Sequence, residues 1–301
     1  MITAIKRQIF RYLKFPFRLY SYVYRNQRRK KFIARQKTLQ KQLLKCYKLG
    51  LDAGFMIKAL HEKGFSIFSE NKEDGLLLYL FSIIGTTNKK CIEIGCGYGS
   101  ECNTANLLIH HEWNGLLIDA GEKQTAHAKR FFKTQIRKKN SRPAIVNAHI
   151  TKKNVNSIVD KYSFSGEVDL LSIDIDGVDY WIWEALNVCK PRVVVVEVQC
   201  IWGSERSVTV PYDDRFEAGF VEGYGIYSGG SLAAFNKLAS KKGYRFIGVE
   251  SSGYNAFFLR NDISPDLIPE EDLSVIDSRP FVKWAKEQFF DQIKDKEWVE
   301  V

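Results

Sequence analysis

The chain has 301 residues, and hydrophobic residues make up 45% of them, which is enough for a sizeable core and excludes an intrinsically disordered chain. The formal net charge of +10 is unevenly distributed: residues 1–50 contain 15 Lys and Arg and no Asp or Glu, whereas residues 51–301 contain 30 basic and 35 acidic residues. No apolar run approaches the roughly 20 residues that a membrane-spanning helix needs. The composition therefore predicts a mildly acidic globular body with a basic N-terminal segment.

Residues 1–50 have the pattern of a basic amphipathic helix. Apolar residues recur there at spacings of three or four, with basic residues between them and Pro16 as the expected site of a kink. The apolar positions are Ile9, Phe10, Leu13, Phe17 and Tyr20. Such a helix can lie on an anionic membrane surface, and the alternative is a solvated helix packed on the domain or on a partner. We expect no nucleic-acid partner, because no recognition motif accompanies the charge.

The six cysteines form neither a C-x-x-C pair nor a Cys/His zinc pattern. Several fall within predicted strands or tight turns, which favours buried, reduced thiols and a cytoplasmic compartment. Basic residues near the N-terminus interrupt any apolar core, so no signal peptide is expected. Peripheral attachment at the inner membrane face, through residues 1–50, is the second option for localisation.

From about residue 65 the sequence alternates short apolar, β-branched strands with helical stretches, which predicts repeated βα units around a parallel sheet. The predicted parallel strands are Lys90–Ile94, Leu116–Asp119, Ala144–Ala148, Val168–Ile173 and Val193–Val198. Tyr244–Val249 and Ala256–Leu259 flank a turn and predict an antiparallel hairpin. We therefore expect a Rossmann-like three-layer αβα fold over residues 51–262, preceded by the basic segment 1–50 and followed by a helical appendage over 263–301.

A glycine-rich turn follows the first predicted strand, in Glu93-Ile-Gly-Cys-Gly-Tyr-Gly99. Glycines let a backbone turn sharply and approach a ligand closely. Their spacing differs from the G-x-G-x-x-G of nicotinamide sites, and Glu93 stands where those sites usually have an apolar residue. An acidic loop without a phosphate cradle suits the cationic S-adenosylmethionine, so we expect it to be bound by Glu93, Gly95, Cys96, Gly97 and Gly99.

The next two strands end in polar residues that suit a nucleoside. Asp119, followed by Ala120, closes the second strand, where a carboxylate can accept both ribose hydroxyl protons. Asn147 ends the third strand, where an adenine amino group would be read, and His149 follows it. The alternative for any single acid at a strand end is a helix cap or a surface charge.

A second acidic constellation follows the fourth strand, at Asp174, Asp176 and Asp179. Carboxylates this close tolerate each other with raised pKa values, a cationic ligand or a divalent metal. Glu197 and Gln199 after the fifth strand offer further oxygen atoms. A divalent metal is compatible with this pattern but is not expected; instead, Asp174 would orient the methionine end of the cofactor and Asp176 would cap the next helix.

Deprotonation of an acceptor hydroxyl needs a base. Asp174 and Asp176 are the first choice for this base. His149 is the one histidine predicted at the edge of the sheet and is the other catalytic candidate. A strong base is not essential, because alignment of nucleophile and sulfonium contributes much of the rate effect.

The chain resembles the FkbM-like family of class I S-adenosylmethionine-dependent methyltransferases, over about residues 65–260. The similar blocks are Phe68–Gly75, Glu93–Thr104, Trp113–Asp119, Ser172–Trp181, Val196–Gln199, Ser207–Tyr212, Ser228–Leu232 and Ser252–Phe258. The resemblance implies O-methylation, often of sugars in surface polysaccharides or of natural products. Family members commonly have Asn where Val178 stands and an aromatic-Asn pair where Val198-Gln199 stands.

The acceptor is expected to be a small molecule or a glycan, such as a glycolipid precursor at the cytoplasmic membrane face. The long aromatic and glycine-rich segment 200–232 is expected to bind it, with Tyr212, Tyr227 and Ser231 as candidates. A second hypothesis keeps the fold without turnover, as a cofactor-binding or membrane-tethered scaffold. A nicotinamide oxidoreductase is disfavoured by the glycine spacing and the hairpin, and the sequence predicts no oligomeric state.

Overall fold

The computed structural model describes residues 33–52, 60–136 and 142–301. The chain divides between Leu49 and Gly50 into two compact units. Residues 33–52 are helical, and Leu39 and Leu49 expose their apolar side chains on this helix. The basic amphipathic helix predicted around Ile9–Tyr20 lies outside the described residues. The predicted domain boundaries at 50/51 and 262/263 stay predictions.

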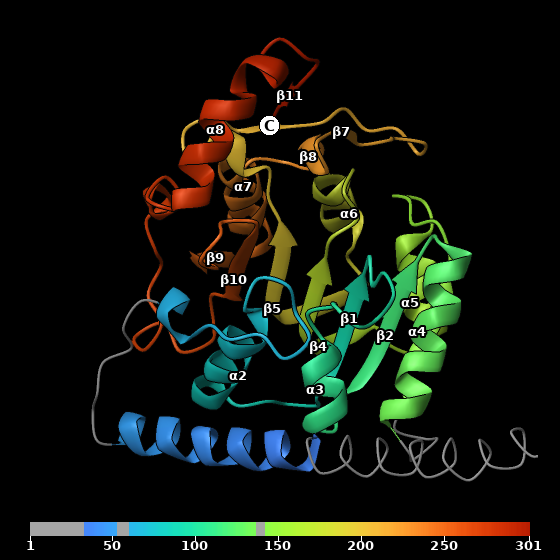
Figure 1. Ribbon diagram of the computed structural model, residues 1–301, viewed down its shortest axis with the longest axis vertical. Coiled ribbons are helices and arrows are strands. Elements are labelled where there is room, and N and C mark those ends of the chain that lie inside the picture. Colours follow the sequence, from blue (N-terminus) through green and yellow to red (C-terminus); the bar gives the residue numbers. More distant parts are fainter. Residues whose placement is uncertain (1–32, 53–59, 137–141) are drawn as a thin grey trace, which may run out of the picture. The chain divides into compact units, whose positions relative to one another are not determined.

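A seven-stranded sheet forms the centre of the unit that starts at Gly50 (Figure 1). Its strands are β1 (Lys90–Ile94), β2 (Asn114–Asp119), β3 (Ala144–Asn147), β4 (Gly166–Ile173), β5 (Cys189–Glu197), β9 (Tyr244–Val249) and β10 (Asn255–Arg260). Their spatial order is β3-β2-β1-β4-β5-β10-β9. Only β10 is antiparallel to its neighbours, so β9 runs in the direction of the first five strands. This sheet confirms the predicted Rossmann-like plan, and it places the second strand of the hairpin between β5 and β9.

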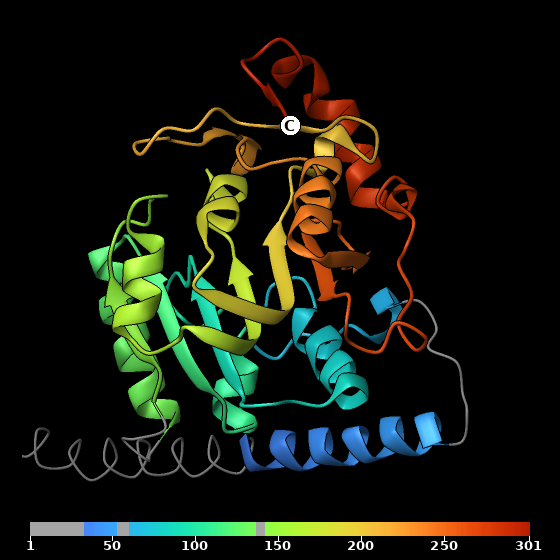
Figure 2. The ribbon, with the colours of Figure 1, turned by 180° about the vertical axis from the view of Figure 1, so that it is seen from behind.

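Helices cover both faces of the sheet (Figures 1 and 2). They are α2 (Glu73–Ile84), α3 (Ala105–His110), α4 (Glu122–Gln135), α5 (Val155–Lys161), α6 (Asp179–Ala185) and α7 (Leu232–Lys242). Alternate strand residues face opposite ways. Ile92 and Ile94 therefore pack in the hydrophobic cluster that contains residues of α5, α6 and α7, whereas Cys91 packs in the cluster that contains residues of α2, α3 and α4. Because the parallel strands are buried on both faces, the ligand-binding side chains are left to the strand ends.

The remaining elements lie before, between and after the strands of the sheet. They are η1 (Leu60–Lys63), η3 (Cys200–Trp202), β6 (Val208–Thr209), β7 (Gly219–Val221), β8 (Tyr224–Tyr227), η4 (Leu273–Val275), α8 (Pro280–Ile293) and β11 (Val299–Glu300). A third hydrophobic cluster, which includes Trp202, Ile226 and Phe289, joins η3 and β8 to α8. β11 pairs with β6, so the C-terminal residues are held against segment 200–232.

Five of the cysteines are buried and Cys46 is exposed, and all six, which lie in the described ranges, are free thiols. Among the residues that the structure describes, no helix combines the length and the hydropathy needed to cross a bilayer.

Candidate functional site

An acidic cavity of about 480 Å³ lies at the carboxyl edge of the parallel strands. Within the described part of the chain, its only basic lining side chain is His149, and neither Lys nor Arg contributes. Its acidic lining residues are Glu70, Glu73, Glu93, Glu101, Asp119, Asp174, Asp176, Glu197, Asp213 and Asp214. A cavity with this lining favours a cationic ligand and disfavours phosphate groups.

The glycine loop between β1 and α3 forms one wall of the cavity, through Gly95, Cys96 and Gly97. Gly95 has φ +93°, and a Cβ there would collide with the main-chain carbonyl of Asp174. Asp174 in turn donates its N–H to the carbonyl oxygen of Ile94 at 2.9 Å. The glycine is required because the loops after β1 and β4 touch at this point.

Asp119 ties the loop after β1 to the end of β2. Its carboxylate accepts the N–H groups of Gly97, at 2.8 Å, and of Gly121, at 2.7 Å. A carboxylate has about four lone-pair sites, so Asp119 can accept further hydrogen bonds from a ligand in the cavity. Ala120 lines the cavity beside it. Asn147 does not line the cavity; its side-chain amide donates to the carbonyl oxygen of Ala120 at 2.8 Å.

Glu93 is almost fully buried, although it borders the cavity. Its carboxylate accepts the N–H groups of Asn103, at 2.7 Å, and of Thr104, at 3.0 Å, and also the Thr104 hydroxyl. These bonds stabilise the N-terminus of α3, where carboxylates are favoured. Burial raises the pKa of Glu93, and the hydrogen bonds with Thr104 and Asn103 oppose that rise. Glu93 therefore has a structural role that its position in the sequence did not reveal.

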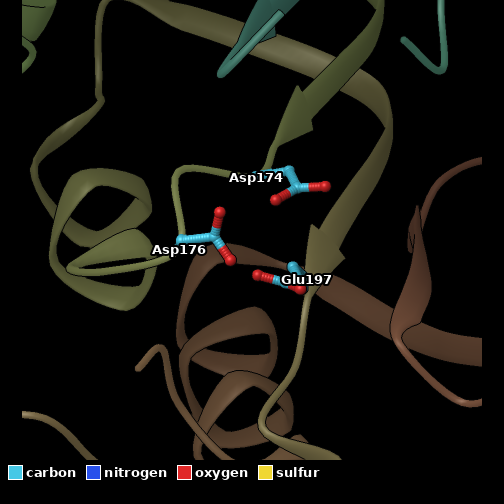
Figure 3. A group of neighbouring side chains, drawn as sticks. All are labelled: Asp174, Asp176 and Glu197. Atoms are coloured by element: carbon cyan, nitrogen blue, oxygen red, sulfur yellow. The ribbon is translucent and has the colours of Figure 1, made fainter. Parts of the chain in front are cut away.

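Three carboxylates meet at the ends of β4 and β5 (Figure 3). Asp174 and Asp176 follow β4, and Glu197 is the last residue of neighbouring β5. One oxygen atom of each lies within 4.8 Å of the others. Asp176 has φ +51°, an uncommon conformation for a residue with a side chain, and this conformation directs its carboxylate toward the other two.

The environment of the three carboxylates disfavours their charged form unless a proton or a cation is bound. Asp174 and Glu197 keep part of their surface exposed, yet the surrounding protein desolvates both carboxylates, and this burial raises the pKa of each well above its ordinary value. The neighbouring carboxylates raise both pKa values further. Asp179 has a different role: it accepts the N–H groups of Ile175 and Gly177, at 2.8 and 2.9 Å. Asp179, rather than Asp176, thus holds the turn before α6.

The segment before β7 forms another wall of the cavity and contacts the residues that follow β3. Asp213, Asp214 and Phe216 line the cavity. The Tyr212 hydroxyl donates to the Asp214 carboxylate and accepts the Lys152 N–H at 2.9 Å. A ring nitrogen of His149, Nε2, lies 2.6 Å from the carbonyl oxygen of Asp214. Because a carbonyl oxygen only accepts, Nε2 carries a proton, and His149 bridges the two walls.

Tyr212, a predicted acceptor-binding residue, lies outside the cavity lining, and so do Gly99, Tyr227, Ser231 and Gln199. A Cβ on Gly99 would crowd Ala128 and Phe132. The Tyr227 hydroxyl donates to the carbonyl oxygen of Glu297 at 2.7 Å, and Ser231 caps α7 by accepting the Ala234 N–H at 3.2 Å. Gln199 donates to the carbonyl oxygen of Gly225 at 3.0 Å. These side chains stabilise segment 200–232.

Several lining residues were not among the predicted site residues. They are Glu70, Glu73, Glu101, Asp213, Asp214, Phe216 and Asn255. Glu70, Glu73, Glu101 and Asn255 belong to the blocks on which the resemblance was based, whereas Asp213, Asp214 and Phe216 belong to none of them. Membership of a block does not show which residues line a cavity.

No family model matches the chain, and no characterised protein matches it in sequence. It is similar in structure to an S-adenosylmethionine-dependent methyltransferase from Clostridium acetobutylicum, with 14% identity, a TM-score of 0.39 and coverage of 63% of this chain and 91% of that one. For PKMT2 from Rickettsia typhi in complex with AdoHcy, the identity is 11%, the TM-score 0.42 and the coverage 67% and 56%. For an O-methyltransferase from Bacillus cereus in complex with SAH, the identity is 16% and the TM-score 0.37. The match covers 72% of this chain and 88% of that one.

Proposed function

We propose that this chain is an S-adenosylmethionine-dependent methyltransferase that methylates a hydroxyl group. The observation that carries the proposal is the pairing of the glycine loop with Asp119 in an acidic cavity whose described lining lacks Lys and Arg. The sulfonium and ammonium groups of the cofactor are cationic, and the ribose hydroxyls suit a carboxylate at the end of β2. The fold, with its switch point between β1 and β4, supports a ligand at this edge of the sheet.

In this proposal the cofactor lies along Gly95, Cys96 and Gly97, with its ribose at Asp119 and its reacting end near Asp174. The acceptor oxygen attacks the methyl carbon, the carbon–sulfur bond breaks, and its electron pair passes to sulfur. The hydroxyl proton passes to a carboxylate, from which it reaches solvent. Asp176 is the candidate for that carboxylate, because it is exposed and lines the cavity.

We further propose that the acceptor is a sugar hydroxyl of a glycan or glycolipid precursor at the cytoplasmic membrane face. Phe216, with Tyr227 packed against it at 5.8 Å between ring centroids, offers an aromatic surface at the cavity. The basic charge of residues 1–50 supports an anionic membrane as the surface where the enzyme meets its acceptor.

The test is calorimetric titration of S-adenosylmethionine into the wild-type chain and into Asp119→Asn. We expect micromolar binding that the substitution weakens at least tenfold, or about 1.4 kcal/mol. Asp266→Asn is the matched control, because Asp266 is exposed and lies outside the cavity lining. Absence of binding to a folded wild-type chain would refute the proposal. Binding without any release of S-adenosylhomocysteine, over a panel of lipid-linked and nucleotide sugars, would favour a scaffold.

A further inference from the structure

We propose that Asp174, Asp176 and Glu197 bind a divalent cation of the oxygen-preferring kind, such as Mg²⁺, Mn²⁺ or Ca²⁺. Binding of the cation follows from the geometry of the cluster alone, whereas its role toward the acceptor rests on the proposed function.

The three carboxylates are spaced as ligands of one ion. One oxygen atom of each lies within 4.8 Å of the others, and Figure 3 shows the side chains directed toward a common point. Ligands on opposite sides of an ion at bond lengths of about 2.0 to 2.6 Å are separated by about 4 to 5 Å. The set contains only carboxylate oxygens, which selects hard cations over zinc or copper.

In the described lining of the cavity, neither Lys nor Arg neutralises these three carboxylates. β4 and β5 are neighbouring parallel strands, so their ends bring Glu197 next to the turn that carries Asp174 and Asp176. Asp179 holds that turn through Ile175 and Gly177. The repulsion between the three carboxylates therefore remains for a ligand to relieve.

A buried oxygen atom beside the cluster provides an independent indication of a ligand. Asn255 is opposite Glu197 in the pairing of β10 with β5, so both side chains leave the same face of the sheet, and both residues line the cavity. The Nδ2 atom of Asn255 donates to the Glu73 carboxylate at 2.8 Å, so the Oδ1 atom of Asn255 is the one that can face a ligand. Asn255 is only 4% exposed, and within the described residues Oδ1 has no hydrogen-bond partner. A buried amide oxygen without a partner is costly, and carbonyl oxygens are ligands of Mg²⁺ and Ca²⁺.

A cation here would change the chemistry of the acceptor. Each carboxylate can give one oxygen atom to the ion and keep the other. A hydroxyl that completes the coordination shell would lose its proton more easily, and one of the free carboxylate oxygens would accept that proton. An acceptor with two adjacent hydroxyls would bind best, because both can reach the ion.

The experiment is electron paramagnetic resonance titration of Mn²⁺ into the full chain, without cofactor. We expect one bound ion per chain that Mg²⁺ or Ca²⁺ displaces, and at least tenfold weaker binding in Glu197→Gln and in Asp176→Asn. Asp213→Asn is the matched control: it removes a carboxylate from the same cavity but outside the cluster, and we expect less than a twofold effect. Thermal unfolding of each variant shows that it is folded.

Failure of this inference and failure of the proposed function are distinguishable. S-adenosylmethionine binding is measured separately in the presence of EDTA. Cofactor binding with no bound Mn²⁺ at millimolar concentration would overturn the cation site alone. Equal Mn²⁺ affinity in wild type and Glu197→Gln would also overturn it. Mn²⁺ binding without cofactor binding would leave the cation site standing and remove the methyltransferase.

Discussion

The main-chain carbonyl of Asp174 occupies the space that a side chain on Gly95 would need. The loop that follows β1 and the loop that follows β4 thus meet backbone to backbone, and the cavity walls depend on that contact. We expect Gly95→Ala to lower the free energy of unfolding by at least about 2 kcal/mol, because steric overlap adds to the strain of φ +93°. Urea denaturation measures this. Gly97→Ala is the control: its Cβ would meet open space, so only about 1 kcal/mol of strain is expected. Equal small costs in both variants would contradict the contact.

Glu93→Gln separates a structural from a ligand-binding role of this acid. The amide keeps one good acceptor for the N-terminus of α3 and loses the second, so we expect stability to fall by about 1 to 3 kcal/mol. Affinity for S-adenosylmethionine should fall less than in Asp119→Asn. Denaturation and calorimetry on the same preparations give both values. Unchanged stability with a large loss of affinity would show that Glu93 contacts the cofactor.

Asp176→Asn tests the acid chemistry of the reacting edge. Asparagine keeps the shape of the side chain but cannot accept a proton, so we expect kcat to fall about 100-fold or more. Affinity for the cofactor should change less than threefold, since the glycine loop and Asp119 are untouched. Single-turnover methyl transfer and calorimetry measure the two effects. A full rate in Asp176→Asn would assign the proton transfer to another group.

Stability should fall as the pH rises from about 4 to 7, in part through Asp74. Burial raises the pKa of Asp74 to about 6, although one of its oxygens accepts the N–H groups of Ile67, Phe68 and Ser69. The folded state therefore binds more protons than the unfolded state between pH 3.8 and 6, and it loses about 3 kcal/mol across that range. Asp74→Asn should make the free energy of unfolding depend less on pH in this range. Urea denaturation from pH 4 to 8 checks this, and an equal slope in both proteins would refute it.

A buried ion pair should matter for stability but not for the cavity. Asp169 within β4 pairs with Arg192 of β5 at 2.8 Å, and both side chains are buried. Arg192→Met leaves the Asp169 carboxylate buried without its cation, which typically costs about 3 to 5 kcal/mol. Lys294→Met breaks the exposed pair with Asp291 and should leave the free energy of unfolding almost unchanged, because solvent screens this pair. Cofactor affinity should be unchanged in both. Thermal and urea unfolding measure the loss of stability in each variant. Equal losses in Arg192→Met and Lys294→Met would contradict the role of burial.

The sequence by itself determined the βα plan and the position of the glycine loop. β-Branched apolar runs separated by helical stretches predict parallel strands buried on both faces, and the structure has β1 to β5 at those positions. Asp119 and Asp174 were predictable as cavity residues for the same reason, because residues at the carboxyl ends of parallel strands share one edge of the sheet. These features depend on local pattern alone.

Only the tertiary structure decided which of these polar groups meet. The insertion of β10 between β5 and β9 brings Asn255 opposite Glu197, although 57 residues separate them in the chain. Glu93 binds the N-terminus of α3, Ser231 caps α7, and Tyr227 donates to Glu297. Each forms a hydrogen bond with a nearby backbone group, and the sequence alone does not show which backbone groups are near. Strand order and register are long-range properties, and a one-residue change in the register of β10 would move the Asn255 side chain to the other face of the sheet.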